Sequence, residues 1–174
     1  LAVVELVGAL DRLWQDSEEM GEPDTVFTVG QLYTDASQHA MTKVPGECAY
    51  SINFGGTTQT YLDAVRDRTI SLAQETGERR NVDFQLGECV GSMPTPLNQG
   101  WRERLCSQAC DLGITNHVMA TVRHDASIFA RAGIPSAMVL VRNQNGSHNA
   151  AEAMEMADFD CGTAMLATTL LDLA

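Results

Sequence analysis

The sequence predicts an α/β chain in two parts: a small ferredoxin-like α+β sandwich followed by a piece of an α/β layer. Residues 47–54 and 81–86 alternate between apolar and polar side chains, which is typical of strands with one buried face. Residues 91–96 carry two prolines and a glycine and form the best linker in the chain. After this linker, helical segments alternate with a short apolar run, as in an α/β layer.

The first part begins with a predicted helix over residues 1–20. Its apolar side chains recur every three or four positions, at Val3, Leu6, Val7, Leu10, Leu13 and Trp14. Residues 25–34 are β-branched and aromatic and predict a strand, and residues 47–54 predict the next one.

Thr57 or Thr58 can cap a second helix over residues 58–76. Its inward positions are Leu62, Val65, Thr69 and Leu72. With strand 81–86, the order is α-β-β-α-β, and one further N-terminal strand would complete a β-α-β-β-α-β sandwich. We therefore place one domain at residues 1–92 and the other at 93–174.

The second part predicts helices over 97–112, 126–132 and 158–173, with a strand over 136–141. The expected inward side chains are Trp101, Leu105, Leu112, Phe159, Met165, Leu166 and Leu170. This part is too small for a complete doubly wound domain, so we expect its sheet to need partners outside the chain.

Composition narrows the possible functions. A net charge of -12 without a basic stripe makes nucleic acid an unfavourable partner, and no apolar stretch is long enough to span a membrane. Five irregularly spaced cysteines indicate reduced thiols and a cytoplasmic protein. Cys106 and Cys110 could share a metal with His117, but the favoured interpretation is that they are two buried cysteines of a helix.

The N-terminus has no Met and resembles the middle of a helix, so we expect a longer natural polypeptide.

A polar loop, Asn145-Gly146-Ser147-His148-Asn149 with Glu152 beyond it, follows the apolar run 137–141. Ligands in α/β sheets sit at the carboxyl ends of strands, and neutral imidazole is the commonest protein metal ligand. The loop therefore suggests a metal-dependent active site. The alternative is an ordinary loop histidine beside an Asn-Gly turn.

Four segments resemble motifs in the C-terminal half of the M20-type metallopeptidase/amidohydrolase family. They are Thr28-Val29-Gly30-Gln31, Val44-Pro45-Gly46-Glu47, Arg123-His124-Asp125-Ala126, and Gly146-Ser147-His148-Asn149 with Glu152. The branch that they resemble most is that of the N-carbamoyl-L-amino-acid hydrolases and allantoate amidohydrolases.

The resemblance implies a zinc-aminopeptidase-like catalytic domain with an inserted lid that dimerises. Residues 1–92 would be the lid without its first strand, and residues 93–174 the C-terminal segment of the catalytic domain. His148 would bind one of two divalent ions, zinc or manganese. His124, Asp125, Arg123, Ser147 and Asn149 would line the substrate pocket. Asp125 could equally cap the helix that follows it, and Arg123 stands where the family usually has Gly.

The sequence departs from the family pattern in the lid. The family's Asn and Arg that hold a substrate carboxylate align with Thr42 and Gly55, and Gly cannot supply a bidentate clamp. The remaining metal ligands, the general-base Glu and the oxyanion histidine precede the lid in the family and are not in this chain. His39 and His117 stand outside the motifs. We expect residues 1–174 alone to bind no metal tightly and to hydrolyse nothing.

The predicted function is therefore part of a metal-dependent amidohydrolase that cleaves a linear C–N bond in an N-carbamoyl or ureido derivative of an amino acid. The resemblance also implies a homodimer through the lid. Two alternatives remain: a non-catalytic dimerisation or regulatory module of the same fold, and a fragment of an M20 aminopeptidase or dipeptidase.

Overall fold

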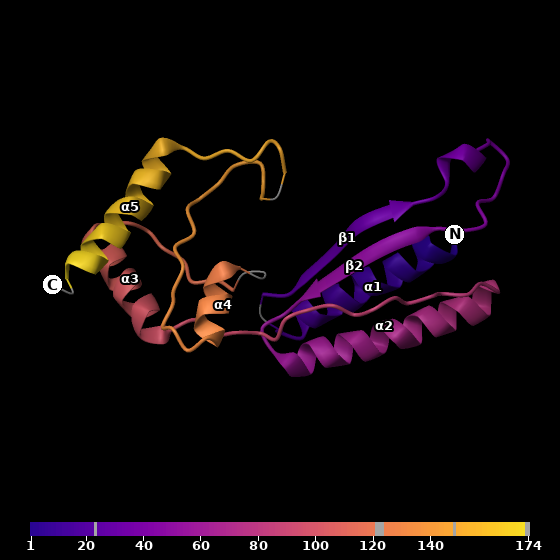
Figure 1. The fold of residues 1–174 in the computed structure, drawn as a ribbon, viewed down its shortest axis with the longest axis horizontal. Coiled ribbons are helices and arrows are strands. Elements are labelled where there is room, and N and C mark those ends of the chain that lie inside the picture. The colour runs from indigo at the N-terminus through magenta and orange to yellow at the C-terminus, as the bar shows by residue number, and fades with distance from the viewer. Residues whose placement is uncertain (23, 121–123, 148, 173–174) are drawn as a thin grey trace. The chain divides into compact units, whose positions relative to one another are not determined.

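The computed structural model describes residues 1–22, 24–120, 124–147 and 149–172. The chain divides into two compact units (Figure 1). Unit 1 is Leu1–Pro94 together with Ala120, and unit 2 is Thr95–Met119 with the described residues from 124 onward. Mixed helix and antiparallel sheet confirm the predicted fold class.

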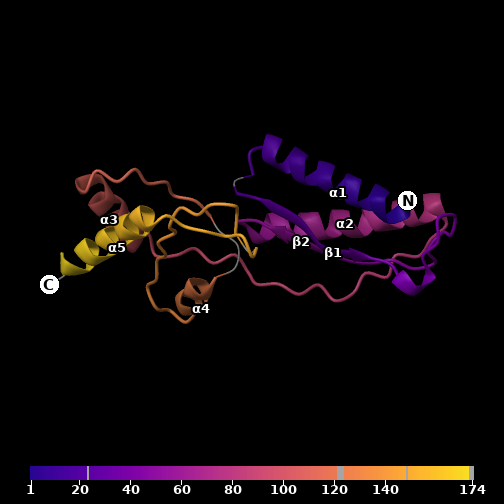
Figure 2. The ribbon, with the colours of Figure 1, turned by 90° about the horizontal axis from the view of Figure 1, so that it is seen from above.

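Unit 1 is a two-layer sandwich of two helices on a two-stranded antiparallel sheet (Figures 1 and 2). Its elements in chain order are α1 (Ala2–Glu19), β1 (Val26–Tyr33), the short 3-10 helix η1 (Ala36–Gln38), β2 (Ala49–Gly55) and α2 (Gln59–Arg80). The hydrophobic core lies between the helices and the sheet, where buried residues of both helices pack against the inner face of the sheet. Its members are Leu6, Leu10, Leu72 and Ala73 from the helices, with Phe27, Tyr50, Ile52 and Phe54 from the strands.

The alternation predicted for residues 47–54 is confirmed. In β2, Tyr50, Ile52 and Phe54 face the core, whereas the side chains between them are exposed. Phe54 lies opposite Phe27 of β1, and the two rings stack with their centroids 4.8 Å apart. A bulge at Gly30 shifts the register between Val29 and Gln31, so that Leu32 lies opposite Tyr50.

Local signals set the ends of α2. The Thr58 hydroxyl accepts a hydrogen bond from the Tyr61 amide at 3.2 Å, as expected of an N-cap. The helix ends at Arg80, four residues beyond the predicted 76, where Asn81 adopts a left-handed conformation with φ of 52°. Asn tolerates this conformation better than most residues and so ends the helix.

The strand predicted over residues 81–86 is wrong. The segment after Asn81 is extended but forms no ladder, and the Val82 amide bonds back to the Gly77 carbonyl at 3.0 Å. Of its three apolar positions only Phe84 packs against the core, whereas Val82 and Leu86 are exposed.

Unit 2 contains α3 (Gln99–Asp111), α4 (Asp125–Arg131) and α5 (Met156–Leu171). Helices α3 and α5 pack together, and Leu105 and Thr169 are buried. The strand predicted over 136–141 is also wrong, because these residues belong to no ladder among the described residues of the unit. One backbone bond, from the Asn98 amide to the Ser136 carbonyl at 2.8 Å, ties the segment to the start of α3.

Several predicted inward positions of unit 2 are exposed. These are Leu112, Phe159, Leu166 and Leu170, and Cys110 is exposed as well. The helical periodicity was correct, but no described sheet lies against these faces. Trp101 and Met165 are partly buried.

All five cysteines are free thiols. Among the helices that the structure describes, none has the length and apolar character to cross a bilayer.

Candidate functional site

The polar loop predicted as a site is a short hairpin between residues 142 and 155. Gln144 and Ala153 form an isolated antiparallel bridge, with N···O distances of 2.7 and 3.3 Å. Beyond the bridge, Asn145 and Gly146 both have positive φ, 64° and 73°. Asn and Gly are the residues that enter this conformation at least cost, so the Asn-Gly pair sets the reversal of the chain.

Two asparagine side chains tie the hairpin together. The Asn149 Nδ2 donates to the carbonyls of Asn145 at 2.8 Å and Gly146 at 3.2 Å, and its Oδ1 accepts from the Ala151 amide at 2.8 Å. In return, the Asn145 Nδ2 donates to the Ala151 carbonyl at 2.8 Å. Asn149 thus uses its amide on the backbone of the loop.

The Glu152 carboxylate accepts hydrogen bonds from two side chains of the hairpin. Its Oε1 accepts from Asn143 Nδ2 at 2.8 Å and from Ser147 Oγ at 3.0 Å. Ser147, a predicted pocket residue, is therefore engaged with Glu152. Gln144 makes a similar bond to Glu155 at 2.9 Å.

An ion pair joins the base of the hairpin to α5. Arg142 donates two bonds to Asp158, Nε to Oδ2 at 3.0 Å and Nη2 to Oδ1 at 2.8 Å. The Asp158 carboxylate raises the pKa of Arg142 above its ordinary value. The fork geometry fixes the direction in which the hairpin leaves the helix.

The second predicted cluster lies at the start of α4. His124 is the N-cap residue, and its carbonyl accepts from the Ser127 amide at 3.0 Å and the Ser127 hydroxyl at 2.7 Å. Asp125 is the first residue of the helix and is exposed, so the capping role suggested for it is wrong. The Nδ1 of His124 is buried and has no hydrogen-bond partner among the described residues. A buried ring nitrogen without a partner is costly, and the same is true of the buried Trp14 Nε1, Tyr50 hydroxyl and Tyr61 hydroxyl.

Two predicted site residues, Arg123 and His148, lie outside the described residues. Among the residues that are described, no group of three His, Cys, Asp or Glu side chains could hold a metal ion. Neither Cys106 and Cys110 with His117 nor the carboxylates of the hairpin make such a group. The described residues alone therefore do not fit a metal centre.

Thr42 and Gly55, the two lid positions at which the sequence departs from the family, have different surroundings. Thr42 is exposed in the loop between η1 and β2. Gly55 pairs with Val26, and a Cβ at Gly55 would lie 3.3 Å from the Val26 Cβ. The end of β2 is thus crowded on the side where a side chain would leave it.

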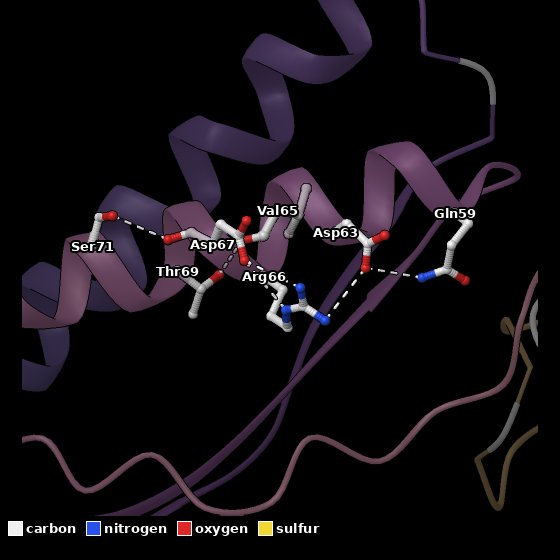
Figure 3. A network of polar contacts seen from close by, with 7 residues as sticks. All are labelled: Gln59, Asp63, Val65, Arg66, Asp67, Thr69 and Ser71. Atoms are coloured by element: carbon white, nitrogen blue, oxygen red, sulfur yellow. Dashed lines mark hydrogen bonds and ion pairs between the residues drawn. The ribbon is translucent and has the colours of Figure 1, made fainter.

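The nearby arginines do not replace the missing clamp. Arg66 pairs with Asp63 at 3.4 Å and Asp67 at 3.3 Å on the surface of α2 (Figure 3). Arg68 pairs with Glu75 at 2.7 Å on the same helix. Both side chains are exposed on the surface of this helix. His39, which stands outside the motifs, shares a 2.6 Å hydrogen bond with Thr34.

Two contributors to the hairpin, Asn143 and Arg142, were not predicted from the sequence. They could not be found from spacing, because their partners lie 9 and 16 residues away.

Two helices on one face of a small antiparallel sheet, followed by three helices and a tied polar hairpin, define a two-part α+β chain. This chain belongs to the peptidase family M20/M25/M40, whose sequence profile matches residues 7–172. No curated protein matches the chain at a significant level.

Solved structures share this fold. AtUAH in complex with (S)-hydroxyglycine is 22% identical with a TM-score of 0.81, over 99% of this chain and 40% of that one. A hydantoinase/carbamoylase family amidase from Burkholderia ambifaria is 22% identical with a TM-score of 0.82, over 98% and 40%. An amidase of the hydantoinase/carbamoylase family from Burkholderia multivorans is 18% identical with a TM-score of 0.87, over 98% and 40%. The chain thus spans about 40% of the length of these relatives.

Proposed function

We propose that residues 1–174 are the lid and the C-terminal catalytic segment of an amidohydrolase that cleaves a linear C–N bond in an N-carbamoyl or ureido derivative of an amino acid. Family membership and the likeness to solved amidases support this proposal. The observation that carries it is the tied hairpin around position 148. Such hydrogen bonding fixes a loop in one conformation, which a ligand-bearing loop requires.

In this proposal, His148 is one ligand of a divalent ion, zinc or manganese, and the other ligands come from polypeptide outside residues 1–174. Members of the family are generally dependent on divalent metals. His124 contacts the substrate through its unpartnered Nδ1, Asp125 follows it as the first residue of α4, and Arg123, which precedes it in the sequence, completes the group. We also propose a homodimer through the lid and a cytoplasmic location.

The test is hydrolysis by the full natural polypeptide that contains residues 1–174. The substrates are N-carbamoyl amino acids, allantoate and dipeptides, each supplied with zinc or manganese, and amine or ammonia release is measured. Release from carbamoyl or ureido compounds alone supports the proposal. Release from dipeptides alone would identify an aminopeptidase or dipeptidase instead.

A non-catalytic dimerisation or regulatory module is the second candidate, and Gly55 favours it. Gly55 carries no side chain to hold a carboxylate, and a Cβ there would lie 3.3 Å from the Val26 Cβ, so Val26 would have to shift to admit one. No release from any substrate, with metal bound and His148 intact, would favour this candidate.

A further inference from the structure

The hairpin contains Asn145-Gly146, the only Asn-Gly step in the chain. Asparagine loses its side-chain ammonia most readily before glycine, because glycine has no side chain to shield its backbone nitrogen from the asparagine. Both residues are exposed, just beyond the bridge between Gln144 and Ala153. A chemically labile pair therefore lies in the hairpin that carries the candidate site.

The turn itself requires this labile pair. Asn145 and Gly146 both have positive φ, a conformation that Asn and Gly adopt at least cost. A side chain at Gly146 would strain the backbone, although its Cβ would make only an ordinary contact of 3.8 Å with the Asn149 Nδ2. Among the described residues, none accepts a hydrogen bond from the Gly146 amide, so no described contact engages the nitrogen that would react.

The Asn145 side chain, in contrast, is restrained. Its Nδ2 donates to the Ala151 carbonyl at 2.8 Å, and the Asn145 backbone carbonyl accepts from the Asn149 Nδ2 at 2.8 Å. Loss of ammonia requires the Asn145 side-chain carbon and the Gly146 nitrogen to turn toward each other and close a five-membered ring. That rotation moves both bonded groups, so the two hydrogen bonds must open first. The rate of the reaction is therefore tied to opening of the hairpin.

We propose that Asn145 is a site of spontaneous deamidation, that the hairpin bonds set its rate, and that the reaction permanently unlocks the loop. The Gly146 nitrogen forms a bond to the Asn145 Cγ, and the bond from Cγ to Nδ2 breaks. The proton of the Gly146 amide departs with Nδ2, which leaves as ammonia. Water then opens the resulting succinimide at one of its two carbonyls, which gives aspartate or isoaspartate at position 145.

Either product removes the ties across the hairpin. In aspartate, an oxygen replaces Nδ2, so the side chain has no donor for the Ala151 carbonyl. The new carboxylate also adds negative charge to a loop that contains Glu152, in a chain of net charge -12. In isoaspartate, the main chain runs through the former side chain and is one methylene longer, so the carbonyl that Asn149 binds leaves its place. The modified hairpin should therefore be looser than the original.

The test is isoaspartate formation in the full natural polypeptide that contains residues 1–174, kept folded at physiological temperature and mildly alkaline pH. Protein isoaspartyl methyltransferase with radiolabelled S-adenosylmethionine counts the isoaspartates, and mass mapping of peptides locates them. We expect label at position 145 that grows with time and faster at higher pH. Asn143, an exposed asparagine of the same hairpin that precedes Gln, should stay unmodified. No label at position 145 after a period that labels the urea-unfolded polypeptide, or equal label at Asn143, would overturn the proposal.

Three variants test the control by the hairpin. Asn149→Ala frees the Asn145 carbonyl and should speed labelling by roughly fivefold. Gln99→Ala, which removes an exposed side-chain bond on α3, should leave the rate unchanged. Asn145→Gln keeps an amide but would have to close a six-membered ring, so it should abolish labelling. The same rate in folded and unfolded polypeptide, or in Asn149→Ala and the natural sequence, would overturn the control by the hairpin.

Amide hydrogen exchange tests the unlocking. Fully aged polypeptide should exchange residues 146–152 at least fivefold faster than fresh polypeptide, whereas aged Asn145→Gln should match its own fresh sample. Equal exchange in aged and fresh natural polypeptide, at a stage when position 145 is labelled, would overturn this part of the proposal.

Discussion

The Asn149 side chain donates to the backbone carbonyl of Asn145 at 2.8 Å, across the loop that holds position 148. The Asn145 side chain in turn donates a hydrogen bond of 2.8 Å to the Ala151 carbonyl. Each asparagine thus satisfies backbone groups that the turn would otherwise leave to water. The two side chains therefore hold residues 145–151 together through their own backbone.

Asn149→Ala should loosen the hairpin without unfolding unit 2. It removes two donated bonds and one accepted bond, each contributing about 1 kcal/mol or less at an exposed site. We expect amide exchange of residues 145–152 to quicken by roughly tenfold. Gln99→Ala, which removes an exposed side-chain bond on α3, is the matched control and should leave the hairpin unchanged. An unaltered exchange rate in Asn149→Ala would show that the asparagine does not hold the loop.

Glu5 should make the stability of unit 1 depend on acidity. Bonds from Arg80 and Arg79 lower the pKa of this carboxyl below its ordinary value of 4.5. A lowered pKa means that the stabilisation is complete above the unfolded value and is lost as pH falls through the folded value. The free energy of unfolding should therefore decline below about pH 4.5 in the natural chain.

Glu5→Gln should remove that part of the decline, and urea unfolding at pH 7 and at pH 3.5 measures it. Asp11→Asn, on the same helix but with a glutamine partner, is the control. Parallel pH profiles for Glu5→Gln and the natural chain would contradict the role of the two arginines.

Gly56→Ala should destabilise unit 1. A Cβ there would lie 2.3 Å from Cδ1 of Tyr61, whose ring is buried, so either the ring or the start of α2 must move. We expect a cost of about 1–3 kcal/mol. Gly46→Ala, at a position with open space around it, should change little. Thermal unfolding compares the two variants, and equal midpoints would show that the ring yields freely.

Leu10→Ala should cost about 2–5 kcal/mol, because Leu10 is fully buried between α1, α2 and the sheet. Val4→Ala, on the same helix at 66% exposure, should cost less than about 0.5 kcal/mol. Denaturant unfolding measures both variants. A similar cost for the two would contradict the placement of the core.

The features of the fold that could be predicted from the sequence are those that depend on interactions between residues close together in the chain. Helix α1, the α2 cap at Thr58 and the alternation of β2 were all predicted, because each depends on neighbours within a few residues. The segments 81–86 and 136–141 have the composition of strands but no ladder, since pairing needs a second backbone that side-chain pattern alone cannot reveal.

The same distinction applies to the candidate site. The Asn-Gly turn was visible in the sequence, and so was the position of His124 beside a helix start. The hydrogen bonds that Asn149 and Ser147 make within the hairpin were not visible, because they depend on the folded conformation of the loop, which spacing does not determine.

The most direct test of the proposed amidohydrolase is a measurement of bound metal by elemental mass spectrometry after dialysis. The three samples are the full natural polypeptide, its His148→Ala variant and residues 1–174. We predict a divalent metal in the full polypeptide, loss of metal in His148→Ala, and none retained by residues 1–174. Stoichiometric zinc or manganese in residues 1–174, or undiminished metal in His148→Ala, would contradict the account.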